Sequence, residues 1–143
     1  MPIVHETVEI NADPDTVFDL IMRIEEFPLY TDALEEVRAI GPDTYHWTAR
    51  AHGIRLEWDS VVTERERPKR LAWRSIRGVV NSGGYTLTPL PGGTRVSFSL
   101  EYRFPNRLLG MLLGPLITRL TRNTAVEILG RVKRRLECCS APR

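Results

Sequence analysis

Apolar and polar residues alternate in several stretches of this chain, and the period of the pattern changes twice. Between residues 3 and 10, Val4, Val8 and Ile10 share one parity, which is typical of a half-buried strand. Asp13 can then cap a helix whose first residue is Pro14. Helical spacing follows at Val17, Phe18, Leu20, Ile21 and Ile24. Because Pro28 stops or redirects the chain, we expect two short helices after the first strand.

The middle of the chain returns to the two-residue period of strands. Six further strands are predicted, at residues 37–40, 45–51, 54–63, 71–76, 85–90 and 95–104. Turn-forming residues separate them: Gly41-Pro42-Asp43, His52-Gly53, Arg67-Pro68-Lys69, Gly83-Gly84 and Pro91-Gly92-Gly93. Connections this short predict an antiparallel meander, so the sheet should hold about seven strands.

The last third is predicted to be helical, with one apolar stripe. The stripe consists of Leu109, Leu112, Leu113, Leu116, Ile117, Leu120, Thr124, Ile128, Val132 and Leu136. Pro115, after Gly114, removes a backbone hydrogen bond and clashes with the preceding turn, so we expect a short helix and then a long one starting near Pro115. We interpret residues 108–113, which include Met111, as a flexible gate.

Simple dimensions predict how the sheet and the long helix pack. Seven strands at roughly 4.8 Å spacing make a sheet on the order of 30 Å wide, whereas a helix with its side chains is about 10–12 Å across. One helix cannot cover a flat sheet of that width, so the sheet must curl around it. The space between them is filled by large side chains, by the short helices or by a ligand. The expected fold is α+β, in a single domain over residues 1–143.

Strand parity and the helical stripe predict which side chains line that space. We expect ligand contacts from Trp47, Leu56, Trp58, Ser60, Val62, Trp73, Asn81, Tyr85, Phe98, Leu113, Ile117, Leu120 and Thr124. The alternative for the tryptophans is an ordinary core. Asn81 precedes Gly83-Gly84, where either an irregular strand admits the ligand or a plain bulge or turn occurs. No His or Asp is spaced to form a triad with Ser60, so this residue is interpreted as part of the wall.

Several stretches resemble a known superfamily. EINADPDTVFDLIMRIEEFPLY, LEWDS, LAWRS and GGTRV, then a strand with Tyr102 running into the long helix, are similar to the START/Bet v 1-like (SRPBCC) group. This group includes polyketide cyclase/dehydrases and coenzyme Q-binding proteins. The resemblance covers nearly the whole chain and implies the helix-grip fold, a sheet wrapped around one long helix. Aromatase/cyclase members place an arginine at the inner position matched by Val62, and this departure counts against their aromatisation mechanism.

Three side chains are candidates for catalysis: Glu6, Tyr45 and Tyr102. Glu6 shares the parity of Val4, and a carboxylate among apolar groups would have a raised pKa suited to acid–base work. Alternatively, Glu6 is solvated near its strand end. The tyrosines, with Tyr85, could donate hydrogen bonds to a carbonyl or enolate oxygen, or they are core residues with one solvated end.

Charge and cysteine content exclude several classes of partner. Lys and Arg total 20 and Asp and Glu 18, a net charge of +2 that supplies no strong field for nucleic acid. Adjacent Cys138 and Cys139 are interpreted as free thiols, and the N-terminus does not resemble a signal peptide, so we expect a cytoplasmic protein. His46 and His52 are too far apart along one strand for a metal site. No nucleotide-binding loop appears, so no cofactor is expected.

The C-terminal helix is basic, with Arg119, Arg122, Arg131, Lys133, Arg134 and Arg135. These residues either form a solvated face that complements the helix dipole or contact an anionic membrane transiently. We expect a monomer or homodimer that binds a hydrophobic, ring- or polyene-like molecule. The resemblance favours a cofactor-independent polyketide cyclase/dehydrase that acts by positioning and by excluding water. The alternatives are a non-catalytic lipid, quinone or isoprenoid carrier, and an accessory protein whose cavity its own side chains fill.

Overall fold

A computed structural model describes residues 3–51, 53–104 and 106–140. Its elements in chain order are the strand β1 (Ile3–Ile10), the helix α1 (Pro14–Ile21), a 3-10 helix η1 (Ile24–Leu29), the strands β2 (Leu34–Gly41), β3 (Thr44–Ala51), β4 (Ile54–Glu66), β5 (Arg70–Gly78), β6 (Val80–Leu90) and β7 (Gly93–Arg103), and the helix α2 (Arg107–Ser140). The seven strands form one antiparallel sheet in the order β1-β7-β6-β5-β4-β3-β2. The expected meander and the α+β fold class are confirmed.

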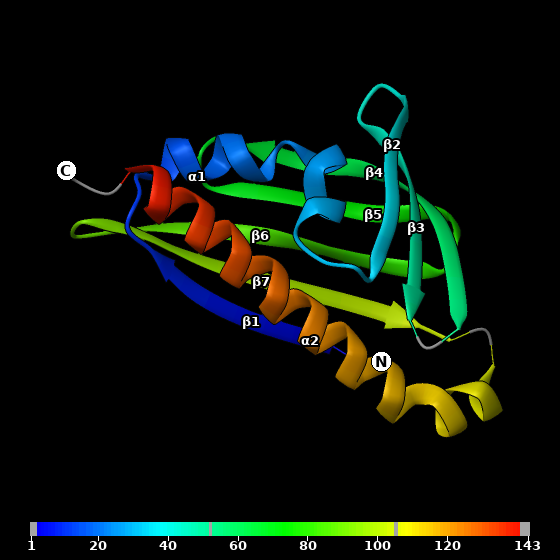
Figure 1. Cartoon of the computed structure of the whole chain (residues 1–143). Coiled ribbons are helices and arrows are strands. Elements are labelled where there is room, and N and C mark those ends of the chain that lie inside the picture. Colours follow the sequence, from blue (N-terminus) through cyan, green and yellow to red (C-terminus); the bar gives the residue numbers. More distant parts are fainter. Residues whose placement is uncertain (1–2, 52, 105, 141–143) are drawn as a thin grey trace.

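The sheet curves around α2, which runs diagonally across its face in Figure 1. α2 packs mainly against β1, while α1 and η1 lie toward its C-terminal end (Figure 1). Arg135 of α2 fixes this arrangement by donating hydrogen bonds of 2.9 Å to the Glu26 carboxylate and to the Tyr30 hydroxyl. Within the described residues, no helix is long and apolar enough to span a membrane.

The expected start of α1 is confirmed. Asp13 occupies the N-cap position, where its carboxylate accepts hydrogen bonds from the Thr16 backbone N–H at 3.4 Å and the Thr16 hydroxyl at 2.5 Å. Pro14 fills the first helical position, where a missing N–H costs nothing. The apolar side of α1 is buried through Phe18 and Ile21, which are part of the hydrophobic core.

The prediction of a turn at Gly83-Gly84 is wrong. Both glycines lie inside β6, and the turn from β5 to β6 falls at Gly78, whose positive φ of 80° suits glycine. A Cβ on Gly83 would lie 2.3 Å from the Ser99 carbonyl oxygen and 3.2 Å from the Trp73 ring. Pairing with β7 is continuous through this region, so the expected irregular strand is also absent. Gly83 therefore permits close packing and does not reverse the chain.

The expected helix break at Pro115 is also wrong, because α2 continues through it. The proline removes a hydrogen bond at a cost of about 3 kcal/mol, which burial of the inner side of the helix can offset. Gly110 and Gly114 also stabilise this part of α2, since the backbone of each packs against the Phe104 ring. The first turns of α2, drawn in yellow in Figure 1, lie at an angle to the rest, as a proline inside a helix would cause.

Candidate ligand-binding cavity

A cavity of about 680 Å³ lies between the concave face of the sheet and α2. Its lining includes eleven of the thirteen residues predicted as ligand contacts: Trp47, Leu56, Trp58, Trp73, Asn81, Tyr85, Phe98, Leu113, Ile117, Leu120 and Thr124. Exposed residues are part of its lining, so it is open to solvent and is not a sealed void in the core. Its volume falls within the range of about 300–1,000 Å³ that is typical of small-molecule sites. We therefore interpret it as a binding space.

One wall of the cavity is built from two stacked tryptophans. Trp47 on β3 lies directly opposite Trp58 on β4, with ring planes 7° apart and centroids separated by 5.9 Å. The indole N–H of Trp47 donates a hydrogen bond of 2.8 Å to the hydroxyl of Ser60. Ser60 is buried, with 2% of its surface exposed. This bond fixes the orientation of the Trp47 ring, so the stack offers a preformed flat surface.

A second aromatic group lies on β5, β6 and β7. The Trp73 ring stacks on Phe98 at 6.1 Å and 28°, and Tyr85 contacts both rings. Phe27 of η1 joins the two groups, with its ring 6.0 Å from Trp47 and 6.3 Å from Tyr85. Trp73, which was predicted as a ligand contact, thus lines the cavity. Burial raises the pKa of the Tyr85 phenol well above its ordinary value, so this group stays protonated.

The cavity wall carries few polar groups. Asn81 is buried, and its side-chain amide donates a hydrogen bond of 2.9 Å to the Val79 carbonyl. The Tyr102 hydroxyl shares a short hydrogen bond with the Thr118 hydroxyl of α2. Arg50 and Arg103 are exposed lining residues, as are Gly78 and Val80. Exposed lining residues mark the opening, which therefore lies at the β5–β6 turn and the end of β7.

Two of the predicted wall residues lie behind the wall. Ser60 and Val62, together with the catalytic candidate Tyr45, line a separate void of about 10 Å³, which is at the limit for one water molecule. Burial raises the pKa of Tyr45, with smaller effects from Arg65 and Asp43. The Ser60 hydroxyl is already engaged by Trp47. Parity placed these residues on the correct face of the sheet, but the large indole rings separate them from the cavity.

Glu6 lies outside the cavity lining as well. Its side chain is 26% exposed and forms an ion pair of 3.6 Å with Arg122 on α2. A carboxylate beside a guanidinium at the molecular surface is not the isolated carboxyl group that would serve as an internal acid or base. Among the three catalytic candidates, only Tyr102 is part of the cavity wall.

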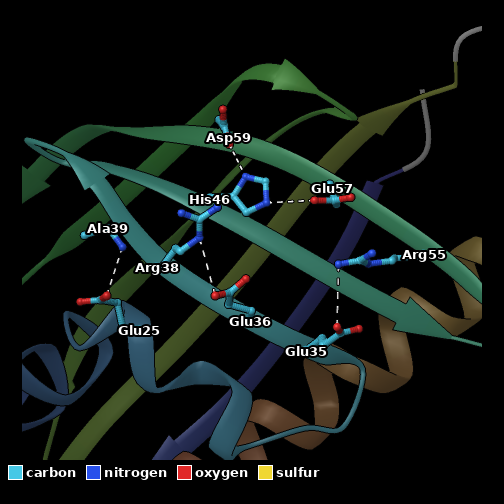
Figure 2. A network of polar contacts seen from close by, with 9 residues as sticks. All are labelled: Glu25, Glu35, Glu36, Arg38, Ala39, His46, Arg55, Glu57 and Asp59. Carbon is cyan, nitrogen blue, oxygen red and sulfur yellow. Dashed lines mark hydrogen bonds and ion pairs between the residues drawn. The ribbon is translucent and has the colours of Figure 1, made fainter.

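The outer face of the sheet carries the other titratable groups of this region. Figure 2 shows His46 between Asp59 and Glu57, at 2.6 Å from the Asp59 carboxylate and 3.1 Å from that of Glu57. These residues fall on the outer parity, as expected. No group of three potential ligands within the described ranges could hold a metal ion, and His52 lies outside those ranges.

Some lining residues were missed by sequence reasoning. Val79 and Val80 were placed between strands, and Arg103 falls on the outer parity of β7, yet all three reach the opening. Phe27 was missed because the 3-10 turn that presents it follows the regular helical pattern. The signal that could have identified the β5–β6 turn is Gly78, because glycine readily adopts the positive φ found there.

The cavity and fold agree with a known family. Residues 1–137 match the family model described as "Polyketide cyclase / dehydrase and lipid transport". The chain belongs to this family. It is thus a member of the START/Bet v 1-like (SRPBCC) superfamily, and the match supports a hydrophobic small molecule as the ligand.

Solved structures share the whole fold. A Thermus thermophilus protein has a TM-score of 0.83 at 24% identity, covering 98% of this chain and 100% of its own. A Deinococcus radiodurans protein has a TM-score of 0.74 at 26% identity, covering 96% and 98% respectively. The Zhui aromatase/cyclase from a Streptomyces species has a TM-score of 0.71 at 16% identity, covering 99% of both chains. At that identity the likeness to Zhui concerns the fold alone.

A curated relative is an uncharacterised 17.2 kDa protein of Streptomyces lincolnensis, 25% identical over 84 residues. The matched region covers 59% of this chain and 56% of that protein. This relative is therefore similar over part of the chain only, and its description names no activity.

Proposed function

We propose that this protein binds one hydrophobic molecule with a flat ring system or conjugated chain in the cavity and carries it without chemical change. One observation carries the proposal: among the described residues that line the cavity, none is an Asp, Glu, His or Cys. General acid–base catalysis near neutral pH relies mostly on such groups. A wall of aromatic and aliphatic side chains with few polar groups is suited to binding.

The shape of the wall supports a planar or polyene-like ligand. The Trp47–Trp58 stack on β3 and β4 and the Trp73–Phe98 pair, which spans β6 from β5 to β7, provide flat surfaces. Aromatic pairs of this kind add about 0.5–1.5 kcal/mol beyond the area that they bury. Any polar end of the ligand is best placed at the opening, where Arg50 and Arg103 are exposed.

A cyclase/dehydrase-like enzyme is the second candidate, and Tyr102 is the observation that favours it. Its hydroxyl is buried on the cavity wall beside Thr118, so it could donate a hydrogen bond to a carbonyl or enolate oxygen. Catalysis would then depend on positioning a reactive chain and excluding water. Glu6 and Tyr45 would have no direct part, since neither lines the cavity.

Binding can be tested with cis-parinaric acid, a fluorescent polyene, and with decylubiquinone as a competitor. The proposal requires saturable binding of one parinaric acid per chain, energy transfer from tryptophan and displacement by the quinone. Replacing Trp58 with Ala should weaken binding about three- to tenfold, the equivalent of one aromatic contact. Replacing the outer-face Arg38 with Ala provides the control. A probe that does not saturate, or equal binding by both variants, contradicts the proposal.

The fate of a ligand that co-purifies with the protein distinguishes an enzyme from a carrier. A carrier returns that molecule with its mass and its chromatographic retention unchanged after incubation, and Tyr102→Phe alters only its affinity. An enzyme changes the retention at constant mass by cyclisation, or lowers the mass by one water by dehydration, and Tyr102→Phe abolishes the change while binding persists.

A further inference from the structure

The first turns of α2 carry large apolar side chains on the side opposite the cavity. Leu108, Met111 and Leu112 are 66%, 72% and 70% exposed. Positions three and four apart lie on one face of a helix, so the three side chains form a continuous patch, called here the apolar patch. On the other side of the same helix Leu113 and Ile117 line the cavity.

A helix that is apolar on both sides is normally buried on both. The inner side of α2 is covered by the sheet and the cavity, whereas the apolar patch has no cover within the described part of the chain. Scattered exposed apolar residues are ordinary, but three on one face of two helical turns are a contiguous surface of the kind that marks an interaction site.

The apolar patch lies beside the opening of the cavity. Val80, an exposed lining residue, pairs with Arg103 at the end of β7. Phe104 follows directly and packs against Gly110 and Gly114 of α2. In Figure 1 the yellow first turns of α2 lie at the same end of the molecule as the tip of β7. The opening and the apolar patch are therefore parts of one surface.

The chain segment that carries the apolar patch has charges of one sign. Residues 102–126 contain four arginines and neither Asp nor Glu, and of these arginines Arg122 is paired with Glu6 of β1. Arg107 precedes the patch, and Arg119 lies further along on the same helical face, since eleven residues correspond to about three turns from Leu108. Both arginines are exposed. Cations at both ends of an apolar helical surface complement a membrane that carries anionic lipids.

We propose that the apolar patch docks onto an anionic lipid membrane, with Leu108, Met111 and Leu112 in the interfacial layer and Arg107 and Arg119 among the headgroups. A second copy of the chain is a poorer occupant. A two-fold contact places the same patch against itself, so it would bring the arginines of both copies together with no carboxylate from residues 102–126 to pair with them. A membrane supplies the missing negative charge.

Docking would place the cavity opening at the bilayer surface, so that a lipophilic ligand could pass between membrane and cavity with little exposure to water. This use of the surface rests on the proposed function. Docking itself does not, because the apolar patch and its arginines are on the outside of α2.

The experiment is co-sedimentation of the full chain with vesicles of phosphatidylcholine containing about one third phosphatidylglycerol, and with pure phosphatidylcholine vesicles. The test variant is L108S/M111S/L112S, and the matched control is L29S/I40S, which changes residues 68% and 45% exposed on η1 and β2. We expect the test variant to bind anionic vesicles about tenfold more weakly or worse. The control should bind like the wild type. R107Q/R119Q should lose about fivefold per arginine and most of its salt dependence.

Equal binding of the test variant and the wild type would overturn the docking proposal, as would equal wild-type binding to neutral and anionic vesicles. A wild-type dimer in solution that the test variant abolishes would also overturn it, in favour of a second copy. Titration with cis-parinaric acid without vesicles keeps the two proposals apart. Wild type that binds the probe but no vesicles refutes docking alone, whereas wild type that binds vesicles but no probe supports docking and refutes the proposed function. Unchanged urea midpoints confirm that the variants fold.

Discussion

Replacing Thr124 with Trp should block the cavity from inside without disturbing the sheet. Thr124 lines the cavity from α2, on the same face as Leu120 and Ile128. Tryptophan adds about seven non-hydrogen atoms, and a ligand that gives up that room at about 0.3 kcal/mol per atom loses about 2 kcal/mol. We therefore expect cis-parinaric acid to bind about 30-fold more weakly.

The same variant separates an open cavity from a filled core. In a cavity of about 680 Å³, the new indole finds space and buries apolar surface, so the free energy of unfolding should hold or rise. In a filled core the extra atoms would overpack, and stability would fall by about 1–3 kcal/mol. Urea unfolding, monitored by circular dichroism, measures the free energy of unfolding. The enhancement of parinaric acid fluorescence measures the affinity for the probe.

Val126→Trp is the matched control, because Val126 is on the same helix but 51% exposed. It should leave probe affinity within about twofold of the wild type. If Thr124→Trp kept wild-type affinity and lost stability, the reasoning from the cavity volume would be refuted. If both variants lost affinity equally, the loss would come from α2 as a whole, and the same reasoning would fail.

The remaining predictions concern packing and electrostatics. Gly83→Ala should lower stability by about 1–3 kcal/mol, because its Cβ would lie 2.3 Å from the Ser99 carbonyl oxygen. Gly130→Ala should raise stability by about 1 kcal/mol, because its added Cβ meets nothing within 4 Å. If urea unfolding showed both glycine variants shifted in the same direction, the predicted difference between the two sites would be contradicted. The Lys133 ammonium, 2.7 Å from the Glu137 carboxylate, holds the pKa of that carboxyl below its ordinary value of 4.5. Folding therefore favours the charged form, so Glu137→Gln should reduce stability at neutral pH. The difference from wild type should fade as pH falls through the lowered pKa, whereas a gap that widens in acid would refute the assignment.

The sheet and much of the cavity wall could be predicted because a two-residue period records which side of a strand is buried. Trp47, Trp58 and Phe98 illustrate this, since parity alone places each on the inner face. Parity does not distinguish residues that line the cavity from residues one layer behind them. Ser60 and Val62 have the correct parity, but the depth of the indole rings places them behind the cavity lining.

Local signals misled where tertiary packing outweighed them. Gly83 and Pro115 are strong turn and break residues in isolation, yet one permits close approach of β7 and the other is accommodated inside α2. Glu6 has inner parity, but its partner Arg122 is more than a hundred residues away in sequence, and no local pattern encodes that ion pair.

The most direct test of the account is native mass spectrometry of the protein purified gently from its own host. We expect the wild-type spectrum to show a single adduct whose mass corresponds to one small hydrophobic molecule. The adduct should be released on organic extraction and absent from the Thr124→Trp variant prepared in the same way. A wild-type spectrum of the bare chain, together with no saturable binding of cis-parinaric acid, would contradict the claim that the cavity holds a hydrophobic ligand.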